Sequence, residues 1–173
     1  MSHILIDTPY EMICKFYGER EAKRSKVPLI NHINEGLIIL DILCASHDTK
    51  DAYCLHPMLQ EDGELSKNAC LVLDHSPYTI MLAMEYRSVA NEFLRGRVND
   101  VTVGKIRLSP LADVNLMLIA DKVQNRKDFE IYHKGTHPKS ADLEEYFSMW
   151  LERLGVSEEQ YQSFVKVLNE RTN

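Results

Sequence analysis

The chain has 173 residues, of which 45% are hydrophobic and 27% are charged. This length and composition are ordinary for a soluble globular protein, and they predict one domain over residues 1–173 with a sizeable core. The net charge of −6 argues against a binder of duplex nucleic acid, which usually carries a basic face. No apolar run approaches the ~20 residues that span a bilayer, and the N-terminus lacks the pattern of a secretory signal.

The four cysteines carry information about the compartment. Cys14, Cys44, Cys54 and Cys70 have no CxxC spacing, and each lies among apolar neighbours. Such cysteines are typical of reduced core thiols and not of zinc ligands or a disulfide framework. The pattern therefore predicts a cytoplasmic protein.

The first helix is predicted by its N-terminal signal. Thr8 is a candidate N-cap, Pro9 occupies the first turn and Glu11 completes a capping box. The helix is expected to end in a basic cluster before Pro28, because proline disfavours helical geometry in the preceding residue. The cluster comprises Arg20, Lys23, Arg24 and Lys26. Basic clusters of this kind are most often solvent-exposed surface in proteins, but beside a phosphate site this cluster would bind the phosphate.

Apolar periodicity and capping residues predict further helices. They cover about residues 30–45, 49–59, 76–94, 110–132 and 140–154, followed by a terminal helix that opens with a capping box of Ser157 and Gln160. Asp48 and Ser140 are the expected N-caps of two of them. The apolar patch 69–73 favours a helix over a strand, and residues 98–109 are expected to form a loop. The sequence thus predicts an all-α protein with about seven helices.

The helix predicted over 110–132 holds a carboxylate in an otherwise apolar run. Asp121 follows a series of apolar residues, and Asn125 lies one turn later on the same face. A buried carboxylate is costly unless it is hydrogen-bonded, charge-paired or bound to a metal. The alternative is that the helix becomes solvent-exposed at Asp121, since Lys122 and other polar residues follow.

Two histidines on other predicted helices favour a buried, metal-binding Asp121 over a solvent-exposed one. His32 lies at the start of one helix, with Glu35 on the following turn, and His56 lies near the end of the next. Each histidine alone is better explained as a hydrogen-bonded core residue. Together with Asp121 they make two imidazoles and a carboxylate, a set that suits manganese, iron or zinc.

Five segments resemble motifs of one enzyme family. Residues 28–32 (PLINH) are similar to "PYINHP", residues 55–56 followed by 61–62 to "LLHDxxED", residues 118–129 (LIADKVQNRKDF) to "KLADKLxNLRDL", and residues 144–147 (EEYF) to "QEYF". In this order, over roughly residues 10–152, they resemble the hydrolase domain of RelA/SpoT enzymes. The last motif is similar to one in the small stand-alone alarmone hydrolases, the metazoan SpoT homologues.

The resemblance implies an HD-domain-like helical bundle, a bound manganese ion, and hydrolysis of the 3′-diphosphate of ppGpp to GDP and pyrophosphate. It also implies roles for ten residues. His32, His56 and Asp121 would be metal ligands, Glu61 and Asp62 would orient or deprotonate the attacking water, and Lys23, Arg24, Lys122, Asn125 and Tyr146 would contact the substrate.

The chain departs from the family pattern at three places. Pro57 replaces the aspartate of the HD pair, which is a metal ligand in the family; the acidic pair lies one residue further on; and Ile33 follows His32 where proline is usual. One interpretation is a working enzyme in which Glu61, Asp62 or Glu35 replaces the missing ligand. The others are an alarmone sensor or sponge without turnover, a scaffold for protein partners, or a related nucleotidase that acts on a deoxynucleotide or a 2′-phosphate.

Overall fold

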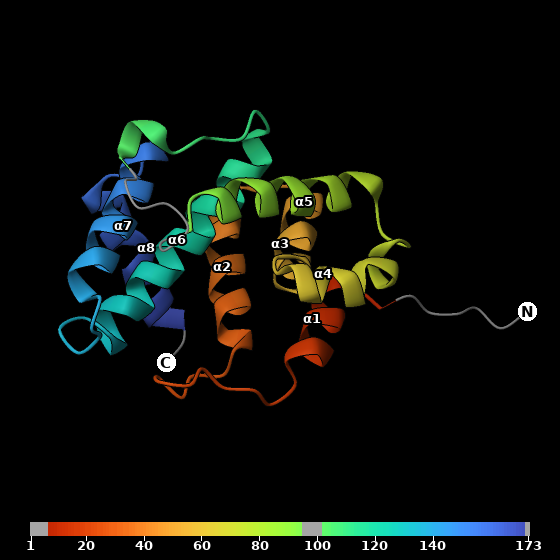
Figure 1. Cartoon of the computed structure of the whole chain (residues 1–173), viewed down its shortest axis with the longest axis horizontal. Coiled ribbons are helices and arrows are strands. Elements are labelled where there is room, and N and C mark those ends of the chain that lie inside the picture. Colours follow the sequence, from red (N-terminus) through yellow and green to blue (C-terminus); the bar gives the residue numbers. More distant parts are fainter. Residues whose placement is uncertain (1–6, 95–101, 172–173) are drawn as a thin grey trace, which may run out of the picture.

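The structure is a computed structural model, and it describes residues 7–94 and 102–171. These residues form eight α-helices and two short 3-10 helices (Figure 1). The elements are α1 (Pro9–Tyr17), α2 (Ile30–Ile42), α3 (His47–Leu59), α4 (Asp62–Asn68), η1 (Ala69–Val72), α5 (Pro77–Glu92), η2 (Val103–Lys105), α6 (Ala112–Tyr132), α7 (Ser140–Arg153) and α8 (Glu158–Arg171). The all-α prediction is confirmed, with eight helices where about seven were expected. The additional helix is α4.

Two local capping predictions are confirmed. The backbone N–H of Glu11 donates to Thr8 Oγ1 at 3.2 Å, and that of Thr8 donates to Glu11 Oε2 at 2.8 Å. Ser157 and Gln160 exchange the corresponding bonds at the start of α8, at 2.9 and 3.2 Å. Each box satisfies backbone donors that the first helical turn leaves unpaired.

Two other predicted caps were wrong. Ser46 caps α3, since its Oγ accepts the Thr49 N–H at 3.2 Å. The Asp48 carboxylate instead accepts the Thr79 hydroxyl at 2.7 Å and joins α3 to α5. Ser140 is the first residue of α7, and its Oγ accepts the Gly135 N–H at 2.9 Å.

The first helix is shorter than predicted, because it ends at Tyr17. Gly18 follows with a φ of 53°, a left-handed value that glycine adopts without strain. The basic cluster therefore lies in an irregular segment, residues 18–29, and not at a helix end. An isolated antiparallel bridge between Glu21 and Pro28 closes this segment.

The remaining expectations have mixed outcomes. The patch 69–73 contains the 3-10 helix η1. The predicted loop 98–109 lies partly outside the described residues, and its described part contains η2. Of the four cysteines only Cys54 is buried, while Cys44 and Cys70 are exposed, so the prediction of four core thiols was wrong. Among the described residues, no helix combines the length and apolarity needed to cross a membrane.

Helix α6 is the central element of the fold. It packs against α2, α3, α5, α7 and α8 (Figure 1). Because neighbours surround it, its buried side chains lie on several faces and include both apolar and polar residues. Asp121 and Lys122 are each 4% exposed. The alternative that this helix becomes solvent-exposed at Asp121 was therefore wrong.

A close approach between α2 and α3 places the two histidines near each other. A Cβ built on Gly36 would overlap the buried ring and hydroxyl of Tyr53, so only glycine fits at this position of α2 without displacing that ring. The Tyr53 ring lies against both imidazoles, with centroids 5.8 Å from His32 and 4.8 Å from His56. The absence of a side chain at Gly36 therefore lets α2 approach the Tyr53 ring of α3 closely.

Candidate metal centre

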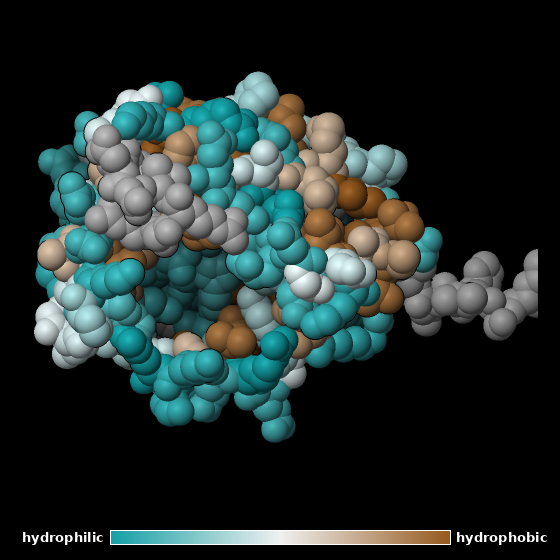
Figure 2. Space-filling view, in the orientation of Figure 1, coloured by the Kyte–Doolittle hydropathy of each residue, from teal (hydrophilic) through white to brown (hydrophobic). Residues whose placement is uncertain are grey.

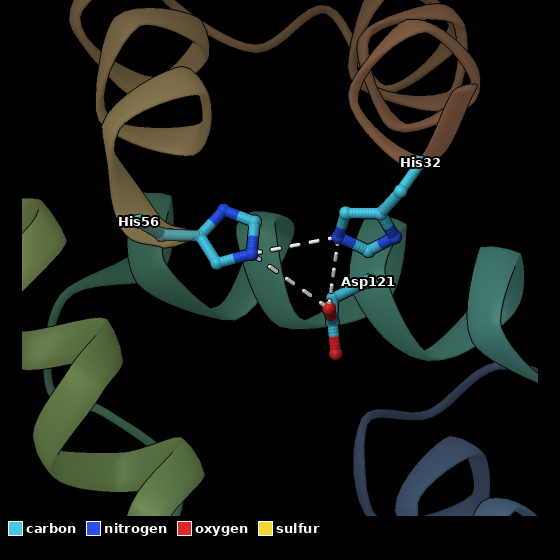
Figure 3. Close-up of side chains that lie close together, drawn as sticks. All are labelled: His32, His56 and Asp121. Atoms are coloured by element: carbon cyan, nitrogen blue, oxygen red, sulfur yellow. Dashed lines mark hydrogen bonds and ion pairs between the residues drawn. The ribbon is translucent and has the colours of Figure 1, made fainter. Parts of the chain in front are cut away.

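His32, His56 and Asp121 come together in the structure from three helices (Figure 3). His32 lies in the first turn of α2, His56 in the last turn of α3 and Asp121 near the middle of α6. The Nε2 atom of His32 lies 3.4 Å from His56 Nε2 and 3.4 Å from Asp121 Oδ1. The distance from His56 Nε2 to Asp121 Oδ1 is 4.0 Å.

The two separations of 3.4 Å suit a shared cation, whereas the 4.0 Å between His56 Nε2 and Asp121 Oδ1 is longer than ideal geometry around one ion gives. Ligand atoms held at about 2.1 Å from one ion lie roughly 3.0–3.4 Å apart in octahedral or tetrahedral geometry. The Nδ1 of His56 lies 2.6 Å from the backbone oxygen of Tyr53, which can only accept, so Nδ1 carries the proton and Nε2 keeps its lone pair. The Nδ1 of His32 lies 2.6 Å from Gln124 Oε1. The three residues could therefore hold a metal ion.

The Asp121 carboxylate is held in its charged form. Burial alone would raise the pKa of Asp121, but Lys122 and the two imidazoles outweigh burial and lower this pKa to about 2. Lys122 Nζ donates to Asp121 Oδ2 at 2.7 Å. Its ammonium group also lies 5.7 Å from the ring centroid of Tyr146 and 5.1 Å from that of Trp150. One carboxylate oxygen thus faces a cation of the protein, and the other faces the histidines.

A cavity of about 500 Å³ opens beside these ligands. Figure 2 shows this face of the molecule hollowed. The lining contains the three candidate ligands and three of the predicted substrate residues, Lys122, Asn125 and Tyr146. The hydroxyl of Tyr146 is buried and has no hydrogen-bond partner among the described residues.

Four of the predicted site residues are not among the residues that line the cavity. Asp62 is exposed and forms an ion pair with Arg87 of α5, and Glu61 is the exposed N-cap of α4. Lys23 and Arg24 are exposed on the irregular segment 18–29. The positions that do face the cavity near the end of α3 are Pro57 and Gln60. Glu35, considered as a replacement ligand, is instead buried against Lys127 at 2.7 Å.

The sequence interpretation missed Gln124. It was grouped with the polar residues of an exposed helix end, yet it is 1% exposed and contacts His32. Its position three residues after Asp121 and four before Asp128 places all three on one helix face. That spacing is the signal that could have identified it.

His56 gives the fold a pH dependence. Burial, assisted by the neighbouring His32, lowers the pKa of His56 to about 3, whereas a histidine in an unfolded chain titrates near ~6.5. Between these values the unfolded chain binds a proton that the folded protein does not. The free energy of unfolding of the metal-free protein should therefore fall as the pH is lowered from about 6.5 towards 4, by about 1.4 kcal/mol per pH unit from this residue.

Urea unfolding at several pH values, with a chelator present, measures this effect. His56→Asn should show a smaller slope of stability against pH than the parent. His47→Asn is the matched control and should keep the parent's slope, because the His47 side chain is 89% exposed in the folded protein. Equal slopes in the parent and His56→Asn would contradict the prediction.

Comparison with protein-family models, with curated proteins and with solved structures gives no match to this chain. The resemblance to the RelA/SpoT hydrolase domain therefore depends on the motifs and on the arrangement of their residues.

Proposed function

We propose that this chain is a metal-dependent phosphohydrolase that acts on a phosphorylated nucleotide and releases pyrophosphate, as the RelA/SpoT hydrolases do with ppGpp. The observation that carries the proposal is the convergence of His32 Nε2, His56 Nε2 and Asp121 Oδ1 in the wall of a cavity. Three further motif residues, Lys122, Asn125 and Tyr146, line the same cavity. This placement is more than a helical scaffold for protein partners requires.

The donor set supports a divalent cation at this position. Two neutral imidazoles and one carboxylate suit manganese, iron or zinc, and the family resemblance favours manganese. Such an ion, when bound, acidifies a coordinated water and polarises a phosphoryl oxygen.

The protein's own groups would bind and orient the substrate. The charge of Lys122 lies in the cavity wall and can offset negative charge on phosphoryl oxygens. The buried hydroxyl of Tyr146, beside the Lys122 ammonium, can donate to an acceptor of the ligand, and the Asn125 amide can donate and accept. A nucleotide diphosphate or triphosphate offers acceptors of all these kinds.

A specific observation favours a second candidate function, nucleotide binding without turnover. Pro57 faces the cavity where the family carries a metal-binding aspartate, and proline has no side chain that can coordinate. Glu61 and Asp62, the predicted acidic pair, are not among the residues that line the cavity. In this alternative the protein would be a sensor or sponge for alarmones.

A turnover assay separates the two candidates. The purified protein is incubated with Mn²⁺ and ppGpp, and pyrophosphate release is followed. We expect release by the parent, a loss of at least about 100-fold in His56→Ala because a metal ligand is removed, and parental activity in His47→Ala. Nucleotides with a 3′-, 2′- or deoxyribose 5′-phosphate, tested in the same way, define the substrate.

The alternative outcomes are also informative. Tight nucleotide binding without release of pyrophosphate or phosphate would select the binding function. Absence of both nucleotide binding and turnover with every substrate would overturn the proposal and favour a scaffold.

A further inference from the structure

A buried polar network lies behind His32, on the side away from the metal centre. At its centre is Gln124, whose Oε1 lies 2.6 Å from His32 Nδ1. The amide nitrogen of Gln124 donates to Glu35 Oε2 at 3.2 Å and to Asp128 Oδ2 at 2.8 Å. Gln124 and Glu35 are each 1% exposed, while Asp128 is half-buried and lines the cavity.

The partners determine which way the amide points. The carboxylates of Glu35 and Asp128, when ionised, can only accept hydrogen bonds. The NH₂ group of Gln124 must therefore face them, and its oxygen must face His32. The opposite orientation would place an acceptor oxygen against two carboxylates and leave their hydrogen bonds unmade.

Lys127 forms ion pairs with both carboxylates. Its Nζ lies 2.7 and 2.8 Å from the two oxygens of Glu35 and 3.0 Å from Asp128 Oδ1. Glu35 belongs to α2, one turn after His32, while the other members belong to α6. The network therefore joins the helix that carries His32 to the helix that carries Asp121.

We propose that Gln124 is a positioning residue that holds His32 as the Nδ1–H tautomer, with Nε2 unprotonated and directed towards His56 and Asp121. The amide oxygen accepts the Nδ1 proton, and a neutral imidazole has no second proton for Nε2. His56 has the same tautomer through the Tyr53 carbonyl. The inference that this tautomer serves metal binding rests on the proposed function. The tautomer itself can be observed in the metal-free protein.

The test reads the tautomer directly. Histidine labelled with ¹⁵N in its ring is incorporated into the metal-free protein, and the ring nitrogens are observed by long-range ¹H–¹⁵N correlation NMR at mildly alkaline pH. The His32 signals are assigned by their loss in His32→Asn. We expect the Nδ1–H pattern in the parent, and a shift towards the Nε2–H form that imidazole favours in water in Gln124→Met.

Two further variants control the test. Gln124→Glu combined with Glu35→Gln exchanges the amide and the carboxylate, so it keeps the net charge and an oxygen for the Nδ1 proton. This double variant should retain the Nδ1–H pattern, and it keeps the test decisive if Gln124→Met fails to fold. Gln60→Met makes the same substitution at another glutamine of the cavity wall. Gln60 bonds to Asn91 and not to a candidate ligand, so its replacement should leave the His32 signals unchanged.

A second readout is metal affinity, measured by competition with a chelating dye using Mn²⁺ or Zn²⁺. Loss of an outer hydrogen bond to a histidine ligand typically lowers affinity about 10- to 100-fold, and we expect a decrease of that size in Gln124→Met alone. An Nε2–H pattern for His32 in the parent or in the Gln124→Glu, Glu35→Gln double variant, or an unchanged pattern in folded Gln124→Met, would overturn the inference. Absence of metal binding by a parent that shows the Nδ1–H pattern would instead overturn the proposed function alone.

Discussion

Replacing Asp121 with asparagine is expected to abolish metal binding and to lower the free energy of unfolding by about 3–5 kcal/mol. The first effect follows because the amide lacks the charge that holds a cation between the two imidazoles. The second follows because Lys122 is 4% exposed and its ammonium lies 2.7 Å from Asp121 Oδ2. Without Asp121 this ammonium would remain buried and uncompensated. Dye competition measures the first effect, and urea unfolding of the metal-free protein measures the second.

A double variant separates the two effects of Asp121. Asp121→Asn combined with Lys122→Met removes the uncompensated ammonium, so much of the lost stability should return while metal binding stays absent. Asp113→Asn, near the start of the same helix, is the control. Its carboxylate bonds to the Tyr78 hydroxyl at 2.7 Å, remote from the ligands, so metal affinity should be unchanged. Parental metal affinity in Asp121→Asn would refute the role of Asp121 as a ligand.

Local signals predicted most helices, and errors arose where tertiary contacts compete for the same side chains. The boxes at Thr8 and Ser157 formed as expected because all their partners lie within three residues. The Asp48 carboxylate could have capped α3, but Thr79 of α5 takes it. A sequence pattern contains no information about such a distant partner. The early end of α1 has a local cause. Gly18 follows the last residue of α1 with a positive φ, and a glycine in the sequence is itself a signal for the end of a helix.

The candidate site was predictable to the extent that single residues and their spacing define it. His32, His56 and Asp121 come together as the motif order suggested. Helix α6 was ambiguous because it is buried on several sides, and its polar residues, including Lys122 and Gln124, are paired inside the fold instead of forming a wet face. Their partners come from α2 and α6 itself. To identify these partners, one must know which face of α6 packs against α2, and the periodicity of the sequence does not give that orientation.

Positions at the edge of the cavity were less predictable. The motif comparison predicted that Glu61 and Asp62 orient or deprotonate the attacking water beside the metal ligands. In the structure, α3 ends at Leu59 and the chain turns into α4 at this point. One additional residue relative to the family spacing moves an acidic pair by about 100° around a helix. Here the pair begins a new helix outside the cavity lining, and Gln60 lines the cavity instead.

Replacing Lys127 with methionine is expected to lower the free energy of unfolding by about 3–5 kcal/mol, because it leaves the buried Glu35 without its charged partner. The two Nζ–Oε distances of 2.7 and 2.8 Å and the burial of both side chains, 5% and 1% exposed, make this the most enclosed ion pair of α2 with α6. Among the residues that the structure describes, the Gln124 amide alone would still donate from a side chain to Glu35. Urea unfolding at pH 7 measures the change.

A double-mutant cycle identifies the cause of that loss. Glu35→Gln combined with Lys127→Met removes both charges and should be more stable than Lys127→Met alone, because the penalty arises from the uncompensated carboxylate. Lys134→Met removes a lysine of an exposed pair with Glu144, at 2.6 Å, and should leave the urea midpoint near that of the parent. If Lys127→Met and Lys134→Met had the same small effect, the Glu35 pair would not stabilise the fold. If the double variant were no more stable than Lys127→Met, the loss would come from packing of the lysine stem and not from the charge left on Glu35.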